Sequence, residues 1–370
     1  MAISIVPLKP EHAEAVKAFN LRISTAPAGL RIDESPKDHP LAKDDGSGLY
    51  REHYLALDGG VVHGGYIMKR QPFYMQGRHV DIGTFQLPIS EGIVDSRYGV
   101  VGVQLLEDAL ARQPQLFCLG MGGFDGPLPR LLTAMRWRLH ACPFYFFINR
   151  PFTVLRNLSF LRKTPFQRTL VDFGAFSGLG YLGIQLLHML ARRYPTPPPA
   201  EISLEPSFGA WADEIWELAK KNYVMIATRD QLALNRLYDA GDARYFRLKF
   251  QAGGKPAGWA LLLDSAMQGH KQFGNLRVGS IVDCLALPGM EERIISGATR
   301  FLLDRGVDLI VSNQLHSSWA SSFKRRGYLS GPSNFVFAVS PELQKSLEPY
   351  AENVTQVHMT RGDGDGPIHL

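Results

Sequence analysis

The sequence has few cysteines and none of the spacings that mark a disulfide framework or a zinc site. Cys118, Cys142 and Cys284 are its three cysteines, they lie far apart, and each sits in an apolar run. Isolated thiols in odd number are typical of buried side chains in a reducing compartment. The sequence also has no Walker loop, no nucleophile elbow and no paired His/Cys motif, so we expect no metal.

The N-terminal segment lacks the features of a secretion signal. No basic stretch precedes an apolar one in Met1–Val16, and a signal peptide contains both. We therefore expect the protein in the cytoplasm.

Charge of either sign is modest. Charged residues make up 20% of the 370-residue chain, and the net charge is +5, with an isoelectric point of about 9.0. This balance favours anionic ligands, such as a phosphorylated cofactor, a nucleotide-sugar or a lipid head group. Because the sequence has no aromatic-interleaved basic stripe, helix-turn-helix or zinc-finger spacing, we expect no DNA partner.

The sequence does contain an internal repeat. Leu131–Ile148 and Ser322–Val339 align without a gap, and each follows a short apolar run. Large apolar side chains coincide at several positions, namely Trp137 with Tyr328, Phe144 with Phe335, Phe146 with Phe337 and Ile148 with Val339. A repeat of this length predicts two copies of one α/β domain. We place the copies at 1–148 and 200–345, with a connector and Pro-rich linker at 149–199 and a tail at 346–370.

Each copy shows the same order of elements. In copy one, Asp58-Gly59-Gly60 separates two β-rich runs and predicts a hairpin. Gly253-Gly254 does the same in copy two. We expect residues 144–148 and 335–339 to be the strands that close copy one and copy two, respectively.

The connector is unusually apolar. Phe173–Ala191 has Ser177, Gln185 and His188 as its clearly polar side chains, and its roughly 19 residues are enough to span a bilayer. A single span would place the two copies on opposite sides of a membrane, which favours a buried connecting helix or helical hairpin. Peripheral membrane contact through residues 150–192 stays open.

A glycine-containing loop enters a helix in copy one. The segment Gly92–Leu106 reads GIVDSRYGVVGVQLL. Backbone amides at the start of a helix, together with the helix dipole, form an anion site. Gly99 and Gly102 would let the backbone approach a pyrophosphate, and the alternative is an ordinary strand–helix turn.

The order of strand, helix, meander, loop, helix, strand, helix and strand resembles the GNAT acetyltransferase superfamily. The loop motif of that family is Gln or Arg, two residues, Gly, one residue, then Gly or Ala. Arg97 and Gly102 match its ends, while Val100 stands at the first glycine position, one residue after Gly99. The resemblance covers nearly all of residues 1–148 and, in outline, residues 200–340.

The resemblance implies an α/β fold with two GNAT-like domains, each a mixed, mostly antiparallel sheet flanked by helices, and a helical apolar segment joining them. It also implies acetyl-CoA, or another acyl-CoA, as co-substrate. The residues that would hold the pantetheine arm are Ile89, Ser90 and Gly92, and those that would hold the pyrophosphate are Arg97, Tyr98, Gly99, Val100, Val101, Gly102 and Val103.

The sequence departs from the family at the usual proton donor. Many GNAT enzymes place a tyrosine where this chain has Leu132 in copy one and Phe323 in copy two, and neither side chain can donate a proton. In copy two the expected phosphate loop, 288–292, carries two carboxylates that would repel a pyrophosphate. Copy one is therefore the better cofactor site.

Acyl transfer to an amine also needs a group that accepts the amine's proton. The candidate catalytic residues are Glu91, Tyr98 and Asp81, with His63 and His79 as further candidates. For Glu91 the alternative is a solvated carboxylate at a strand end, and for the histidines it is a structural role.

Copy two offers a candidate acceptor site. Asn313, His316 and Trp319 follow a buried strand and could bind a sugar or peptide acceptor. The alternative is that Ser317 or Ser318 caps a helix and Trp319 lies in the core. Asp363 and Asp365 in the tail could bind a cation or acceptor hydroxyls, or form a plain turn.

We therefore expect an acyltransferase that moves an acetyl group from acetyl-CoA to an amine of a small molecule or of a glycan or cell-envelope precursor. The tandem arrangement also resembles FemAB-like transferases, for which aminoacyl-tRNA would replace acetyl-CoA. The third interpretation is a non-catalytic GNAT-like binding protein.

Overall fold

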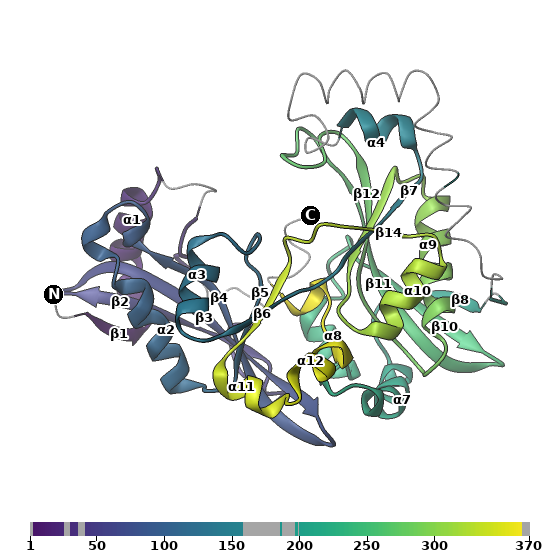
Figure 1. Cartoon of the computed structure of the whole chain (residues 1–370), viewed down its shortest axis with the longest axis horizontal. Coiled ribbons are helices and arrows are strands. Elements are labelled where there is room, and N and C mark those ends of the chain that lie inside the picture. Colours follow the sequence, from purple (N-terminus) through teal and green to yellow (C-terminus); the bar gives the residue numbers. More distant parts are fainter. Residues whose placement is uncertain are drawn as a thin grey trace. The chain divides into compact units, whose positions relative to one another are not determined.

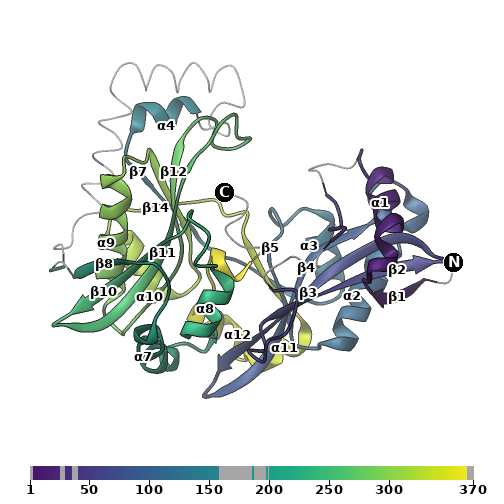
Figure 2. The same ribbon diagram turned by 180° about the vertical axis from the view of Figure 1, so that it is seen from behind.

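The computed structural model describes residues 3–25, 30–35, 41–157, 186, 197–198 and 200–364. The chain forms two compact units, each containing one central sheet (Figures 1 and 2). The first unit contains residues 1–141 and 334–353, and the second contains residues 142–333 and 354–370. This α/β architecture, with helices flanking mixed sheets, is the expected fold class.

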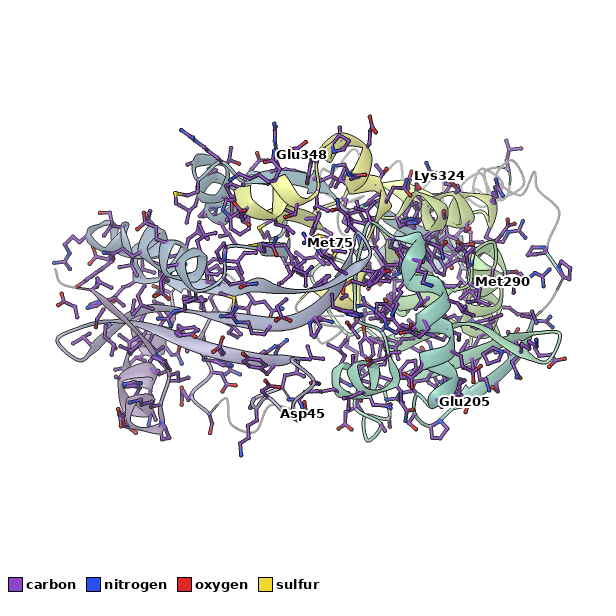
Figure 3. All side chains as sticks on the ribbon, turned by 90° about the horizontal axis from the view of Figure 1, so that it is seen from below. Asp45, Met75, Glu205, Met290, Lys324 and Glu348 are labelled. Carbon is purple, nitrogen blue, oxygen red and sulfur yellow. The ribbon has the colours of Figure 1, made fainter. Side chains whose placement is uncertain are left out.

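The first unit is built on a sheet of strand order β1-β2-β3-β4-β5-β15-β6. Its strands are β1 (Ser4–Pro7), β2 (Tyr50–Asp58), β3 (Val61–Met75), β4 (Arg78–Ser90), β5 (Leu116–Gly120), β6 (Arg138–Ala141) and β15 (Val336–Val339). Its helices are α1 (Ala13–Arg22), α2 (Val101–Arg112), α3 (Pro127–Ala134), α11 (Pro341–Ser346) and α12 (Tyr350–Asn353). Glu348 lies between the last two (Figure 3).

Glycines with positive φ form the hairpins of the first sheet. Gly59 and Gly60, at φ +56° and +86°, join β2 to β3. Gln76 and Gly77 join β3 to β4 in the same left-handed region. Two consecutive residues of this conformation match the twist of paired strands, which is why the Asp58-Gly59-Gly60 signal predicted this hairpin correctly.

Helices α1 and α2 cover opposite faces of the first sheet. Val16 and Phe19 of α1 join a core with Leu55 of β2, whereas Leu105 of α2 joins a core with Tyr54. Neighbouring residues of a strand point to opposite faces, so Tyr54 and Leu55 place the two helices on different sides.

The second unit repeats this plan with strand order β14-β7-β13-β12-β11-β10-β8. Its strands are β7 (Phe144–Ile148), β8 (Glu201–Glu205), β9 (Met225–Ala227), β10 (Phe246–Ala252), β11 (Lys255–Ala266), β12 (Arg277–Ala286), β13 (Leu309–Asn313), β14 (Leu329–Gly331) and β16 (Val357–His358), of which β9 and β16 pair with each other. Its helices are α4 (Pro151–Asn157), α7 (Ala210–Ala219), α8 (Gln231–Leu237), α9 (Glu291–Asp304) and α10 (Ser317–Arg325).

The closing strands are exchanged between the two copies, contrary to the expected boundaries. The strand expected to close copy one, β7, lies between β13 and β14 in the second sheet. The strand expected to close copy two, β15, lies between β5 and β6 in the first sheet. The sequence predicted both strands correctly, but the prediction placed each strand in the wrong sheet. An apolar run indicates a buried strand and does not indicate which neighbouring strand it will pair with.

Most of the expected apolar connector lies outside the described residues, including Ser177, Gln185 and His188. The described part is α4, whose Val154 packs against Phe273 and Leu276 of the second unit. Among the residues that the structure describes, no helix is long and apolar enough to cross a membrane.

Candidate functional site

Strands β4 and β5 of the first unit pair over a very short distance and then separate. The pairing joins Gly83 to Leu116 and Thr84 to Phe117, with no further pairs between these strands. From Phe85 to Ser90, the edge of β4 that faces β5 is therefore free of a neighbouring strand within the described residues. An unpaired strand edge presents N–H and C=O groups to which another extended chain can bond.

A β-bulge marks the point of separation. Gly65 of β3 pairs with Ile89, but Ile67 pairs with Gln86, so β4 has one extra residue between these pairs. Leu87 lies in the bulge and has φ +44°. Bulges bend a strand and increase its twist, which accounts for the departure of β4 from β5.

The loop that follows β4 brings free backbone amides to the end of this open edge. Two short 3-10 turns, Glu91–Ile93 and Ser96–Tyr98, lead into α2. Helix-starting amides have no partner within their own helix, and those of Val100, Val101 and Gly102 make no backbone hydrogen bond in the described structure. The loop therefore has the amides and the helix dipole that an anion requires.

Gly92 rather than Gly99 or Gly102 is the glycine that the loop conformation requires. A Cβ atom at Gly92 would lie 2.8 Å from the carbonyl oxygen of Tyr98 and 2.9 Å from Cα of Gly99. At Gly102 the nearest atom would be 3.9 Å away, on Leu131. Gly92 thus permits the loop to fold back on itself, while Gly102 leaves room beside the first turn of α2.

The Arg97 guanidinium is paired within the loop. Its Nε and terminal nitrogen donate to the Asp95 carboxylate, the shortest distance being 2.6 Å, and 77% of the side chain is exposed. Solvent screens an exposed ion pair, so this pair adds little to the stability of the loop. A bound pyrophosphate could therefore compete with Asp95 for this guanidinium.

Glu91 holds the loop to two other elements. Its two carboxylate oxygens accept from Nε and a terminal nitrogen of Arg22, at the end of α1, over 2.8 and 3.1 Å. Oε2 also lies 2.7 Å from Nδ1 of His63 on β3, and the imidazole stacks on Tyr98 with ring centroids 4.3 Å apart. Burial alone would raise the pKa of Glu91, but the hydrogen bonds from Arg22 and His63 lower it below its usual value.

This geometry separates the three candidate catalytic residues. Glu91 and Tyr98 lie together at the loop, whereas Asp81 is exposed near the other end of β4. Ten residues of extended strand correspond to roughly 33 Å, so Asp81 cannot act together with Glu91. His79 lies at the same distant end and contacts Tyr74 edge-on.

The second unit has the same strand separation, but its own chain fills it. β12 pairs with β13 from Val278 to Ile281, and an extra residue, Val282, follows. Beyond that point, His358 Nε2 donates to the carbonyl of Cys284 over 3.0 Å, and the amide of Leu315 donates to the carbonyl of Met359 over 3.1 Å. The C-terminal segment thus joins the separated ends of β12 and β13.

A buried ionic cluster fixes this C-terminal segment. Arg229 lies 2.9 Å from Asp283 and 2.6 Å from Asp363, and all three side chains are buried. Burial alone would lower the pKa of Arg229, but the two carboxylates raise it well above its usual value. Asp363 is therefore an internal ion-pair partner in a capped 3-10 turn, and Asp365 lies outside the described residues.

The start of α9 in the second unit corresponds to the start of α2 in the first. A side chain of the second unit already occupies this position. Met290 precedes this helix (Figure 3). The Glu291 carboxylate accepts from the amides of Gly289 and Glu291, and burial raises its pKa despite these bonds. A carboxylate already holds the amides that would otherwise face a phosphate.

The three candidate acceptor residues lie inside the second unit. Asn313 donates to the carbonyl of Pro143 over 3.3 Å, and Trp319 donates to the Tyr223 hydroxyl over 3.1 Å. His316 caps α10 by accepting from the amide of Ser318, and burial lowers its pKa to about 4. The capping alternative describes this arrangement, except that the cap is His316 and not a serine.

Arg22 is a site residue that the sequence did not indicate. It ends a helix, and nothing in the local pattern connects it to Glu91, which is 69 positions away. His63 was among the candidates, but its link to Glu91 and Tyr98 depends on the fold.

Comparison with known proteins identifies the fold and not a close relative. No protein-family model matches the sequence, and no curated protein does. A conserved protein of unknown function from Enterococcus faecalis V583, described as a probable N-acyltransferase, is 10% identical with a TM-score of 0.53, and the match covers 94% of this chain and 75% of that one. A GCN5-related N-acetyltransferase from Anabaena variabilis ATCC 29413 gives the same identity, coverage and TM-score.

Saccharomyces cerevisiae N-myristoyltransferase with bound myristoyl-CoA is also similar, at 8% identity and a TM-score of 0.52, with 92% of this chain and 78% of that chain covered. Identities this low establish the fold alone. The resemblance to FemAB-like transferases stays a prediction. The chain has the fold of the GNAT-type N-acyltransferases, present in two copies with mixed sheets.

Proposed function

We propose that this protein transfers an acyl group from an acyl-CoA to an amine, and that the first unit holds the cofactor. The observation that carries this proposal is the free edge of β4 between Phe85 and Ser90, which ends at the unbonded amides of Val100, Val101 and Gly102. A molecule that carries both an extended arm and an anionic group would fit this arrangement. Its arm would bond to the edge of β4, and its anionic group would bond to the amides.

The residues present fit such a cofactor. The pantetheine arm, which contains amide groups, would bond to the edge of β4 near Ile89 and Ser90. The pyrophosphate would accept from the amides of Val100, Val101 and Gly102, where Gly102 leaves space. The Val103 amide, which the resemblance also implied, already donates to the carbonyl of Val100 over 3.0 Å. The cofactor supplies an activated acyl group as a thioester, and the chain supplies orientation.

The reaction balances without an additional reagent. The amine nitrogen attacks the thioester carbonyl carbon, the carbon–sulfur bond breaks, and the amide product and free thiol result. The amine loses one proton and the thiolate gains one. Because both Glu91 oxygens are already bonded, we propose that Glu91 positions the loop through Arg22 and His63, and does not itself remove the proton.

The second unit supports the fold and does not hold a second cofactor in this proposal. Its strand separation is filled by residues 357–360, and its helix start by Glu291. Acetyl-CoA is the simplest donor, and a longer acyl chain is compatible with the same contacts.

Calorimetric titration with acetyl-CoA tests the cofactor site. Gly102→Glu places a carboxylate beside the proposed pyrophosphate without a steric clash, and Arg97→Glu reverses the charge of the loop. Ala111→Glu is the matched control, because it adds the same charge to α2 about 13 Å along the helix. We expect micromolar binding in the wild type and in the control, and at least about tenfold weaker binding in the other two, which corresponds to about 1.4 kcal/mol.

The absence of binding by a folded wild-type protein would contradict the proposal. So would equal weakening by all three variants, since a general charge effect would then explain the result.

A non-catalytic acyl-CoA-binding protein is the second candidate. It is favoured by Leu132 and Phe323, which are buried at the positions where a proton-donating tyrosine would be expected. Release of free thiol from acetyl-CoA in the presence of amines distinguishes the two candidates, because only a transferase produces thiol in proportion to acceptor.

A further inference from the structure

One face of β3 and β4 carries polar side chains in buried positions. Lys69, Gln71 and Thr84 are each 1% exposed and Gln86 is 3% exposed. On β4, Thr84 and Gln86 alternate in the sequence with Phe85 and Leu87, a pattern that is typical of a strand with one solvated face, whereas on β3 the charged Arg70 separates Lys69 from Gln71. The structure instead buries both faces of these strands.

The four side chains share the face opposite α2. Lys69 pairs with Thr84 across the two strands, and Gln71 pairs with Ile82. Residues next to them in sequence, Met68 and Phe85, point into the core that contains α2. Strand alternation therefore places Gln71 and Thr84 on the other face as diagonal neighbours.

The side chains of Gln71 and Thr84 have no hydrogen-bond partner within the described part of the chain. Both Oε1 and Nε2 of Gln71 are buried and unbonded, and so is Oγ1 of Thr84. Buried polar groups without partners destabilise a fold, whereas an apolar side chain of similar shape would not. Fold stability therefore does not explain why these polar groups are present.

Their position is defined by the strand separation. Thr84 is the last residue of β4 that pairs with β5, and the bulge at Leu87 follows it closely. A cofactor with phosphates at the start of α2 and an arm along β4 would bring its acyl end toward this point. The polar face then lies where an acceptor amine must approach.

The chemistry of Gln71 limits what can satisfy it. A carboxamide has one acceptor oxygen and two N–H donors. A carboxylate would leave the oxygen unbonded and would itself lose its hydration, while an alkyl group would leave both atoms unbonded. A primary carboxamide has an N–H and a C=O on the same side, and so does one residue of an extended peptide; either pair can bond to both ends of the Gln71 side chain.

We propose that Gln71 and Thr84 bind the acceptor, and that the acceptor carries a peptide or carboxamide group in addition to its reacting amine. This inference rests on the proposed acyl transfer and names the acceptor class for the same site. The amide group bonds to Gln71, and the Thr84 hydroxyl provides a further donor or acceptor.

Acyl transfer to two matched amines tests this specificity. Glycylglycinamide and pentylamine are the probes, with free-thiol release from acetyl-CoA as the readout. In the wild type we expect kcat/KM for the peptide amide to exceed that for the alkylamine at least tenfold. In Gln71→Leu and Thr84→Val we expect this ratio to fall toward one, with the KM for acetyl-CoA unchanged.

A control and a stability measurement separate recognition from folding. Gln344→Leu removes from α11 a carboxamide that donates to Glu348, and we expect it to leave the acceptor ratio unchanged. We also expect the Tm of Gln71→Leu to equal or exceed that of the wild type, because the substitution removes an unbonded amide.

Three results would overturn the proposal. They are a Gln71→Leu variant that keeps the wild-type acceptor ratio, a Gln71→Leu variant with a clearly lower Tm, and no transfer to the peptide amide by a wild-type protein that binds acetyl-CoA. Failure of the wild type to bind acetyl-CoA is a different result, since it overturns the proposed function itself.

Discussion

The carboxylate of Glu91 lies 2.7 Å from Nδ1 of His63, and this contact ties the loop after β4 to strand β3. An ionised carboxylate only accepts hydrogen bonds, so Nδ1 carries the proton. Arg22 holds the same carboxylate from the end of α1. One buried side chain thus joins a helix, a strand and the loop that leads to the proposed phosphate site.

Glu91→Gln should weaken cofactor binding and stability together. A glutamine cannot balance the Arg22 charge, and a buried partner left unsatisfied costs about 1–3 kcal/mol. We expect a free energy of unfolding lower by about this amount in urea titration, and weaker acetyl-CoA binding by calorimetry. Glu52→Gln is the control, since it breaks the ion pair with Arg70 on β2 and β3 and should leave cofactor binding intact.

Glu91→Gln also tests the role predicted for Glu91 from the sequence, which is to accept the proton of the amine. A loss of thiol release by several orders of magnitude, with cofactor affinity and stability unchanged, would identify Glu91 as the proton acceptor and contradict a positioning role.

Gly92→Ala should disturb the loop much more than Gly102→Ala. The added Cβ at Gly92 meets backbone atoms of Tyr98 and Gly99 at 2.8 and 2.9 Å, which no rotamer change can relieve. We expect at least about tenfold weaker acetyl-CoA binding for Gly92→Ala, and an unfolding free energy lower by about 1–3 kcal/mol. Gly102→Ala has ordinary contacts and removes a glycine from a helix, so thermal unfolding should show no loss of stability.

Equal Tm values for the two alanine variants would mean that the loop at Gly92 adjusts freely, and would contradict the close approach as the constraint on its shape.

Local features of this chain could be predicted from the sequence. Gly59 and Gly60 indicated a hairpin, and the glycine-containing segment after Glu91 indicated a loop that leads into a helix. Both predictions were possible because these features depend on the backbone preferences of adjacent residues. The resemblance to the GNAT fold followed from the order of such elements, and the solved structures confirm it.

Pairings between distant segments could not be predicted in the same way. Nothing near Glu91 in the sequence indicates Arg22, and nothing near Gln71 or Thr84 in the sequence indicates that their polar side chains are buried. The filling of the second sheet's separation by residues 357–360 depends on Arg229, Asp283 and Asp363 meeting in the interior. Such contacts are set by tertiary packing, which local periodicity does not contain.

Stability should fall as the pH decreases from about 6.5 toward 4. Burial lowers the pKa of His316 to about 4 and that of His358 to about 3, whereas an unfolded histidine titrates near pH 6.5. Between these values the unfolded chain binds protons that the folded chain does not, so acid favours unfolding. Each histidine contributes a slope of at most about 1.4 kcal/mol per pH unit.

His316→Asn tests this assignment, because asparagine retains the ability to cap α10. We expect the variant to have a shallower pH dependence than the wild type in urea titrations at pH 7.0, 6.0 and 5.0. An unchanged slope would mean that His316 does not remain neutral in the folded protein.

The exchanged strands predict which fragment can fold as the first unit. Residues 1–148 lack β15, which lies between β5 and β6. In the repeat, Phe147 takes the place of Ala338, and Ala338 is fully buried in the core beside Leu132 and Trp137. A phenylalanine at that position would overpack the core, so β7 cannot substitute for β15.

A designed connection should restore this unit. Ala141 and Val336 are directly opposite each other at the adjacent ends of two antiparallel strands, so a two-residue Asn-Gly turn can join them. We expect residues 1–141, Asn-Gly and residues 336–353 to form a soluble protein that unfolds cooperatively and binds acetyl-CoA. The 1–148 fragment should aggregate through its unpaired edges. If 1–148 instead unfolds cooperatively and binds the cofactor, β7 can occupy the position of β15, and side-chain size at Ala338 does not determine which copy each strand joins.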